Sequence, residues 1–142
     1  MEGLKLFAGD WSALEHQCRS VRDEVFVAEQ NVPIELEHDA NDPVCLHVVA
    51  ISVADGVAVG TGRLLPDGHI GRMAVRKPWR AQGVGGAMLA LLIEEARERG
   101  HAKVVLNAQL SAEAFYRAFG FKAVGEVFRE AGIDHQTMEL AL

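Results

Sequence analysis

The chain has 142 residues, a usual length for one folding unit, and we expect residues 1–142 to form a single domain. Apolar residues make up 49% of the chain and charged residues 24%, which is typical of a globular protein and excludes a disordered one. The formal net charge is −6 and the chain has no run of lysine or arginine, so we expect no nucleic-acid partner.

The two cysteines, Cys18 and Cys45, stand neither in a CxxC pattern nor near a histidine at metal-ligand spacing. One disulfide between them remains an alternative, but reduced thiols in a cytosolic protein fit better. The most apolar helical stretch, Met88–Ala96, is far shorter than the roughly 20 residues of a membrane span, and no secretory segment opens the chain. We therefore expect a cytoplasmic protein with no metal and no membrane partner.

The first half of the chain predicts a strand, a helix and then an antiparallel meander. Leu4–Ala8 alternates between apolar and polar residues like a short strand. Ser12 and Glu15 form a capping-box signature, and the helical spacing that follows extends to about Ala28. After a polar loop, Asp55-Gly56 is a hairpin signal between two apolar runs. The three predicted strands of the meander are Cys45–Ala54, Val57–Leu65 and His69–Val75.

The second half predicts a crossover between parallel strands. A long amphipathic helix, Gly83–Arg99, is followed by Gly100 as its C-terminal glycine. The apolar strand Val104–Asn107 comes next, and the order strand, helix, strand favours a parallel connection. Ser111 is expected to cap a second helix, Ala112–Phe119. Two more strands are expected around Lys122–Val127 and His135–Leu140. We predict a mixed α/β fold with a largely antiparallel sheet and a late parallel crossover.

A glycine-rich loop that follows a strand and opens a helix is the most informative segment. The first N–H groups of a helix lack internal partners and lie at the positive end of its dipole, so they suit an anion. A Walker loop needs a lysine and then Ser or Thr where this chain has Gly86-Ala87, and an early dinucleotide-binding unit is also missing. Three glycines can also simply form a tight turn. The segment reads Arg80-Ala81-Gln82-Gly83-Val84-Gly85-Gly86-Ala87.

This segment resembles the pyrophosphate loop of the GNAT acetyltransferase superfamily, whose pattern is Q/R-x-x-G-x-G/A. Ile70–Val75 resembles the fourth strand of that family, and Ala114–Phe121 resembles its late helix and turn. Val25–Pro33 and Gly132–His135 are similar to segments of the ElaA-like branch. The resemblance covers nearly the whole chain. It implies the acyl-CoA N-acyltransferase fold, in which the fourth and fifth strands splay apart.

The resemblance also implies that acetyl-CoA is the cosubstrate, with its pantetheine arm between the splayed strands. The arm would bond backbone groups of Met73 and Val75, and the pyrophosphate would rest on loop amides. Asn107 either bonds the pantetheine or the acetyl carbonyl, or it caps a turn. The implied cofactor-binding residues are Met73, Ala74, Val75, Arg80, Ala81, Gln82, Gly83, Val84, Gly85, Gly86 and Asn107.

An amine that attacks a thioester needs orientation, a group that accepts its proton and a proton for the leaving thiolate. By resemblance, Tyr116, the only tyrosine of the chain, is the general acid. The alternative is a core aromatic residue beside Phe115 and Phe119. For the base, the sequence offers an acidic loop or a chain of water molecules. We expect the strand histidines to be structural or surface residues, namely His47, His69 and His135.

The acidic loop between Gln30 and His47 carries its carboxylates with no lysine or arginine in the same segment. An unneutralised cluster attracts a cationic amine, although a solvated acidic loop is the alternative. Glu37 is the candidate base or amine ligand. Arginines in neighbouring strands would bind an acidic group of the acceptor or point to solvent. The candidate substrate-binding residues are Glu35, Asp39, Arg63 and Arg72, and Asp42 belongs to the same acidic cluster.

Together these features predict an N-acetyltransferase that moves an acetyl group to a primary amine of a small molecule or peptide in a ternary complex. The alternative is a non-catalytic acyl-CoA-binding sensor or scaffold, and a third candidate is a phosphate-binding protein with a similar loop. Tyr116 favours the enzyme, because a sensor has no use for an acid beside a thiolate. We expect either a monomer or a homodimer.

Overall fold

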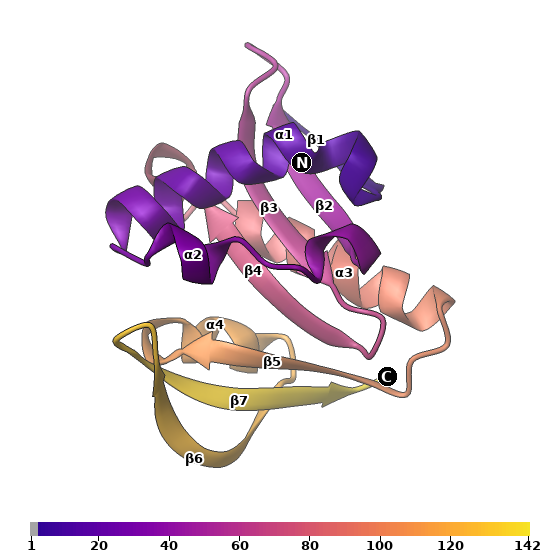
Figure 1. The fold of residues 1–142 in the computed structure, drawn as a ribbon. Helices are drawn as coiled ribbons and strands as arrows, with labels where there is room; N and C mark the ends of the chain where they lie inside the picture. Colours follow the sequence, from indigo (N-terminus) through magenta and orange to yellow (C-terminus); the bar gives the residue numbers. More distant parts are fainter. Residues whose placement is uncertain (1–2) are drawn as a thin grey trace.

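The computed structural model describes residues 3–142 and contains a seven-stranded sheet in the order β1-β2-β3-β4-β5-β7-β6 (Figure 1). All neighbouring strands are antiparallel except β4 and β5, which are parallel. The predicted mixed α/β fold with one late parallel crossover is therefore confirmed. The strands are β1 Leu4–Gly9, β2 Leu46–Ser52, β3 Ala58–Leu64, β4 His69–Val75, β5 Lys103–Gln109, β6 Lys122–Glu130 and β7 Ile133–Ala141.

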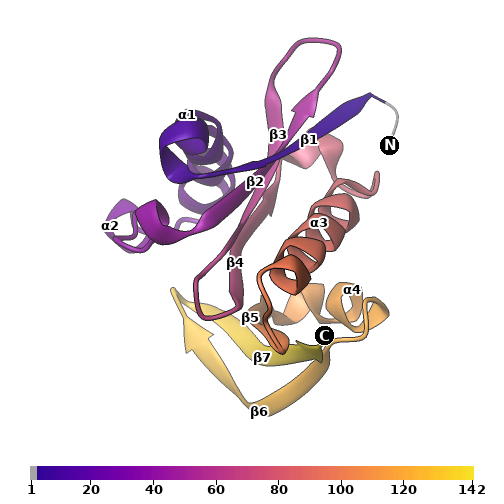
Figure 2. The ribbon, with the colours of Figure 1, turned by 90° about the vertical axis from the view of Figure 1, so that its right-hand side faces the viewer.

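Helices cover both faces of the sheet (Figure 2). Figure 2 shows α1 and α2 on one side of β2–β4, with α3 and α4 on the other side. A π-helical segment, η1, continues α1. Among residues 3–142, no helix combines the length and apolar content needed to cross a membrane. The helices are α1 Trp11–Arg22, η1 Asp23–Glu29, α2 Ile34–Glu37, α3 Val84–Glu98 and α4 Glu113–Ala118, with 3₁₀ turns at Asp42–Val44, Lys77–Trp79 and Leu110–Ala112.

The first helix begins earlier than its capping box predicts. Asp10 is the N-cap, and its carboxylate accepts a hydrogen bond from the Ala13 N–H at 3.0 Å. The predicted Ser12 cap is wrong because Asp10 already binds the free amide, and a carboxylate also suits the positive end of the helix. The helical path ends at Glu29, one residue past the prediction, but its last seven residues are π-helical. The predicted Ser111 cap is also wrong, because Ser111 lies in a 3₁₀ turn.

The main core lies between the sheet and α3. The α3 side chains Met88, Leu89 and Leu92 are fully buried, and their spacing places them on one helical face. Gly60 of β3 allows this close packing, because a Cβ there would lie 2.8 Å from Met88 Cε. Each of these buried apolar side chains contributes about 1.5–3 kcal/mol to folding. This core fixes α3, and with it the glycine loop, against the middle of the sheet.

The pairing between β4 and β5 is short. His69 pairs with Val105 and Ile70 pairs with Leu106, and the two strands then run on without further pairing to Val75 and Gln109. The other neighbouring strands pair over more residues. Strands β5 and β7, for example, pair along all seven residues of β5. The sheet therefore consists of two halves that diverge beyond Ile70, as the family resemblance implies.

The edge strand β6 carries a large bulge. Its residues 125–127 stand opposite the single residue Gln136 of β7. Gly125 has φ +73°, and the Gln136 side chain donates to the carbonyls of Val124 and Gly125 at 2.9 Å each. The bulge bends β6 away from a flat edge.

Candidate functional site

A cleft of about 660 Å³ opens where β4 and β5 diverge, a volume typical of ligand sites. Its floor is the exposed edge of β4 with the end of β5. One wall comes from η1 and α2, and the other comes from α4 and the turn between β6 and β7. Of the residues predicted for the site, the cleft is lined by Glu37, Asp39, Arg63, Arg72, Met73, Ala74, Val75, Arg80, Asn107 and Tyr116.

The floor of the cleft contains a bulge in β4. Thr61 pairs with Ala74 and Arg63 pairs with Gly71, so the intervening residues Arg72 and Met73 fall out of register. Arg72 has φ +51°, a conformation that non-glycine residues rarely adopt. Within residues 3–142, no strand pairs with this edge of β4 beyond Ile70. Apart from the Val75 carbonyl, which accepts a hydrogen bond from Arg80 Nε, the backbone N–H and C=O groups of this edge are therefore available to a ligand that lies along the strand.

The predicted anion loop leads directly into α3. Ala81 and Gly83 have φ +61° and +87°, and Gly83 is the N-cap without a side-chain hydrogen bond to the helix. The first amides of α3 therefore keep their hydrogen-bonding capacity for an anion. The loop borders the cleft rather than lining it, since a Cβ on Gly85 would lie 3.8 Å from Val75 Cγ2. The predicted residues outside the cleft lining are Ala81, Gln82, Gly83, Val84, Gly85 and Gly86, together with Glu35.

Arg80 is already engaged within the protein. Its guanidinium binds the Glu29 carboxylate at 2.5 and 2.7 Å, and its Nε donates to the Val75 carbonyl at 2.9 Å. The hydrogen bond from Arg80 lowers the pKa of Glu29. Arg80 therefore ties η1 to the end of β4. The sequence predicts that Arg80 contacts the cofactor, but in this structure its charge is paired with Glu29.

Tyr116 lies in the cleft wall on α4 and is 8% exposed. Its ring packs edge-on against Phe115 and Phe121, with centroids 5.0 and 5.8 Å away. Burial raises the pKa of the Tyr116 hydroxyl to about 12, because the phenolate would lose its hydration. The hydroxyl therefore keeps its proton at neutral pH while it borders the cleft. Tyr116 is thus packed as a core aromatic residue and also lines the cleft, so its position agrees with both interpretations of the sequence.

Asn107 lies on β5 at the cleft floor, where its Oδ1 accepts a hydrogen bond from Thr137 Oγ at 2.8 Å. This bond joins neighbouring strands, since Asn107 and Thr137 are register partners. The Asn107 side chain therefore has an amide group left to offer the cleft, and it does not cap a turn.

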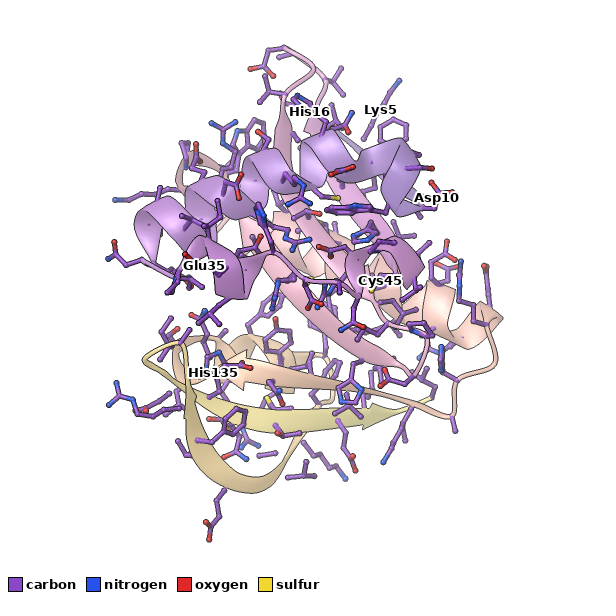
Figure 3. The ribbon with its side chains drawn as sticks, viewed as in Figure 1. Lys5, Asp10, His16, Glu35, Cys45 and His135 are labelled. Carbon is purple, nitrogen blue, oxygen red and sulfur yellow. The ribbon has the colours of Figure 1, made fainter. Side chains whose placement is uncertain are left out.

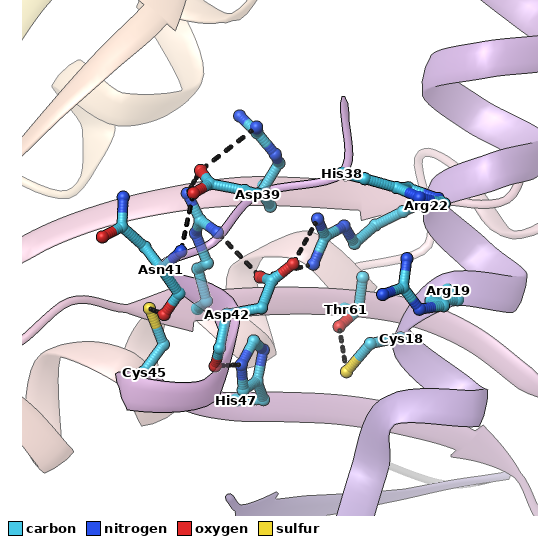
Figure 4. Close-up of polar contacts among 12 residues, drawn as sticks. Cys18, Arg19, Arg22, His38, Asp39, Asn41, Asp42, Cys45, His47 and Thr61 are labelled. Carbon is cyan, nitrogen blue, oxygen red and sulfur yellow. Dashed lines mark hydrogen bonds and ion pairs between the residues drawn. The ribbon is translucent and has the colours of Figure 1, made fainter. Parts of the chain in front are cut away.

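The acidic loop is held by arginines from other elements (Figure 4). Arg22 of α1 is buried between two carboxylates, with Nε 3.0 Å from Glu37 Oε2 and Nη1 2.9 Å from Asp42 Oδ1. Arg63 of β3 binds the same Asp42 oxygen at 2.7 Å and Asp39 Oδ2 at 2.7 Å. The carboxylates thus bridge arginines that lie far apart in the sequence.

Arg72 completes this ion-pair network from the bulge of β4. Its Nε lies 3.0 Å from Glu37 Oε2, and its Nη2 lies 3.4 Å from Asp39 Oδ2. We call the six residues Arg22, Glu37, Asp39, Asp42, Arg63 and Arg72 the ion-pair network. Three guanidinium groups balance three carboxylates in it, so the loop presents no net negative charge to the cleft.

The prediction of an unneutralised acidic cluster is therefore wrong, because the neutralising arginines come from α1, β3 and β4. The alternative of a solvated loop fails for Glu37 and Asp42, which are 2% and 1% exposed, and holds for Glu35, which is exposed. Burial would raise the pKa of Asp42, but hydrogen bonds and charge from Arg22 and Arg63 outweigh it, and the pKa is lowered. Glu35 alone of the candidate ligands is exposed and lies outside the cleft.

Within residues 3–142, one group of possible metal ligands shares Glu37 with this network and adds Asp23 and His38. The carboxylate of Glu37 already binds Arg22 and Arg72, whose positive charges oppose a cation. His38 Nε2 faces Asp23 Oδ1 at 3.6 Å. The donor set therefore suits ion pairing better than metal binding.

The strand histidines have different surroundings. His47 is buried, and its Nε2 lies 2.9 Å from the Asp42 carbonyl, so its predicted structural role is confirmed. His69 is exposed and faces Asp67 at 3.0 Å. His135 lines the cleft on β7 opposite α2, which the sequence analysis missed (Figure 3). The pairing of β7 with β5 is the missing signal, because it places His135 beside Gln109 at the cleft floor.

A diverging parallel strand pair, a bulged fourth strand and a glycine-rich helix start define the fold of acyl-CoA N-acyltransferases. The family model described as "Acetyltransferase (GNAT) domain" matches residues 11–142. The chain belongs to this family of acetyltransferases, and both the predicted fold and the predicted family are confirmed.

Relatives and solved structures agree with this assignment. The chain is 38% identical to the "Uncharacterized N-acetyltransferase YjcF" of Bacillus subtilis over 83% of this chain and 86% of that protein. It is similar to an acyl-CoA N-acyltransferase structure from Pseudomonas aeruginosa, with TM-score 0.87, 31% identity and coverage of 97% and 99%. The Escherichia coli ElaA structure superposes with TM-score 0.85, 26% identity and coverage of 96% and 98%.

Proposed function

We propose that the protein is an acetyl-CoA-dependent N-acetyltransferase that acts on a primary amine of a small molecule or peptide. The observation that carries this proposal is the cleft between the diverging strands β4 and β5. Its floor offers unpaired backbone groups, its border carries the free start of α3, and its wall holds a protonated tyrosine. An acyl thioester with a long amide-containing arm and a pyrophosphate needs these three features together.

Acetyl-CoA is proposed to lie with its pantetheine arm along the edge of β4. The arm would bond backbone groups from Met73 to Val75, and the side-chain amide of Asn107 faces the same floor. The pyrophosphate would rest on amides of Gln82–Gly86, where glycines leave room for it. Contact between Arg80 and the phosphates would require exchange of its Glu29 partner.

The proposed chemistry is direct attack of the amine on the thioester carbonyl. The N–C bond forms and the C–S bond breaks, so sulfur needs a proton as it leaves. Tyr116 supports this role because its hydroxyl borders the cleft and its pKa of about 12 keeps it protonated. Glu37 is better suited to hold Arg72 in place than to act as a base, since its carboxylate already faces two guanidinium groups.

The acceptor is proposed to enter from the side walled by η1 and α2. Arg72 has a side-chain exposure of 28% there, whereas Arg63 and Asp39 are held deeper within the ion-pair network. Because the network is balanced in charge, we expect the Michaelis constant of the acceptor to depend little on ionic strength. Arg72 is the group of this wall best placed to contact the acceptor.

The proposal is tested by binding and turnover together. Acetyl-CoA at about 100 times its dissociation constant should stabilise the protein by roughly 2.7 kcal/mol in thermal unfolding. Screening of a library of amines with detection of the released thiol should then identify an acceptor. Gly85→Glu should remove the stabilisation, because its carboxylate would repel the pyrophosphate. A Cβ fits at this position, since its nearest atom would be Phe115 Cζ at 3.6 Å.

Ala90→Glu is the matched control, because it adds the same charge at an exposed position of α3. It should keep the acetyl-CoA shift. An unchanged shift in Gly85→Glu would remove the loop from the proposed binding site. Binding without thiol release from any amine would point instead to an acyl-CoA sensor.

A further inference from the structure

His135 is a buried histidine whose side chain opens onto the cleft. It is 8% exposed, and it lies on β7 between Gln109 of β5 and Phe128 of β6. The Phe128 ring stacks on the imidazole with centroids 5.8 Å apart and planes at 21°. The imidazole is therefore held in one orientation at the wall that faces α2 across the cleft (Figure 3).

A hydrogen bond fixes which imidazole nitrogen carries the proton. His135 Nδ1 lies 2.7 Å from the Ile133 carbonyl oxygen. A carbonyl oxygen only accepts hydrogen bonds, so Nδ1 must be the donor. In the neutral ring, Nε2 then has a free lone pair and can take up a proton. The Phe128 ring thus sets the orientation of the imidazole, and the Ile133 carbonyl sets its tautomer.

One carboxylate lies close to the free nitrogen of His135. Glu130 of the adjacent β6 places Oε2 3.9 Å from Nε2. The register partners Gln109 and Phe128 carry no charge. Asp134 faces Arg129 at 3.5 Å, so that pair is balanced. Across the cleft, Glu37 and Arg72 neutralise each other.

We infer that His135 is the base that accepts the proton of the acceptor amine, an inference that rests on the proposed function. As the amine nitrogen bonds to the acetyl carbon, Nε2 takes the proton that nitrogen loses. The C–S bond breaks and the sulfur takes the proton of Tyr116. The imidazolium then releases its proton to solvent and the tyrosine takes one up, so both groups return to their starting state. An acceptor that binds as an ammonium releases one more proton to solvent.

The other candidates for the base are less suitable. Glu37 is paired with Arg22 and Arg72, so its carboxylate is already committed to two guanidinium groups. His69 faces Asp67 through Nδ1 at 3.0 Å, but it is exposed at the end of the cleft where β4 and β5 still pair. His135 alone among these three combines burial, an uncommitted nitrogen and a nearby carboxylate.

The test compares His135→Gln with the parent protein in thiol-release kinetics over a range of pH. The glutamine variant should lose turnover about 10²–10⁴-fold and should lose the rise of kcat with pH that a base produces. Its acetyl-CoA affinity, measured by thermal shift, should stay close to that of the parent. His16→Gln is the control, because His16 is exposed on α1 outside the cleft (Figure 3), and it should behave as the parent.

Chemical rescue separates catalysis from packing. Added imidazole should restore part of the turnover of His135→Ala and should leave the parent unchanged. An active parent whose His135 variants keep its turnover and pH profile, or a failure of rescue with cofactor binding intact, would overturn this inference alone. The same holds if His69→Gln, rather than His135→Gln, flattens the pH profile. No thiol release from the parent with any amine would overturn the proposed function, and the role of His135 with it.

Discussion

Tyr116 shows how one residue can belong to the core and to the site. Its ring fills a space beside Phe115 and Phe121, while its hydroxyl borders the cleft. The sequence offers a reason to select it, because it is the only tyrosine of the chain. The two roles can be separated, since phenylalanine keeps the ring and removes the proton donor.

Tyr116→Phe should lower kcat about 10²–10⁴-fold and leave the acetyl-CoA dissociation constant nearly unchanged. Stability to urea should also change little, because the aromatic contacts remain. Thiol-release kinetics and acetyl-CoA titration measure the two effects. Equal losses of binding and turnover would assign Tyr116 to packing, and unchanged kcat would remove it from the proposed mechanism.

Asp42 is the centre of the ion-pair network, and its carboxylate is 1% exposed between Arg22 and Arg63. Its pKa is lower in the folded protein than in the unfolded chain, so its contribution to stability is complete above the unfolded pKa of about 3.9. That contribution is lost as the pH falls from there through the folded pKa. The network should therefore weaken in acid.

Asp42→Asn should destabilise the protein by about 3–5 kcal/mol at pH 7, because the buried guanidinium groups of Arg22 and Arg63 each lose one of two carboxylate partners, which leaves three arginines against two carboxylates. The variant should also lose part of the decline in stability below about pH 4. Urea unfolding at several pH values measures both effects. Glu35→Gln removes the same charge from an exposed position of the same loop, and it should cost little. Similar losses in both variants would contradict a special role of Asp42.

The partners of these carboxylates could not be predicted from the sequence. Arg22 lies on α1, and Arg63 and Arg72 lie on strands that reach the loop only in the folded sheet. A count of charges within the loop shows its four carboxylates but none of the arginines that neutralise them. The same reason applies to His135, because its place at the cleft depends on the long-range pairing of β7 with β5.

At the scale of elements, the sequence predicts local structure well wherever one periodicity persists. The strand His69–Val75 and the long helix α3 agree with prediction, the latter within one residue at each end. The prediction for β6 stops around Val127, the last residue of the bulge, whereas the strand extends to Glu130. Beyond the bulge, Phe128–Glu130 pair again with Ile133–His135 of β7.

The same bulge has a role at the edge of the sheet. An exposed edge strand can pair with another chain, and bulges are a common means to prevent it.

The π-helical segment η1 is a second departure from regular structure, and it lies beside the cleft, where Val25 and Phe26 form part of the wall. Such π-helical turns occur often at functional sites. Neither departure has a signal in residue periodicity, which describes only regular helices and strands.

At the scale of the whole molecule, the two halves of the sheet are joined by few strand hydrogen bonds. Pairing between β4 and β5 is limited to His69 with Val105 and Ile70 with Leu106. A ligand bonded to the free edge of β4 would add contacts where the strands offer none. The stability of the second half, β5 to β7, should therefore depend on the ligand more than that of β1 to β3.

Amide hydrogen exchange of the native protein tests this dependence. Acetyl-CoA at about 100 times its dissociation constant should slow exchange about 100-fold for amides whose opening requires release of the ligand. These amides should lie mainly in β4 and β5 beside the cleft. Amides that open locally in β1, at the far edge of the sheet, should exchange at an unchanged rate. Equal slowing throughout the sheet would show that the halves open together.

The bulged, unpaired edge of β4 also has a consequence for variation of the chain. If the acyl carrier is recognised by main-chain groups at Met73 and Val75, their side chains are released from that task. Substitutions along this strand can then alter the shape and polarity of the cleft without loss of the carrier. Binding of the acyl donor would then depend on the backbone, and selection of the acceptor would depend on side chains that can vary independently.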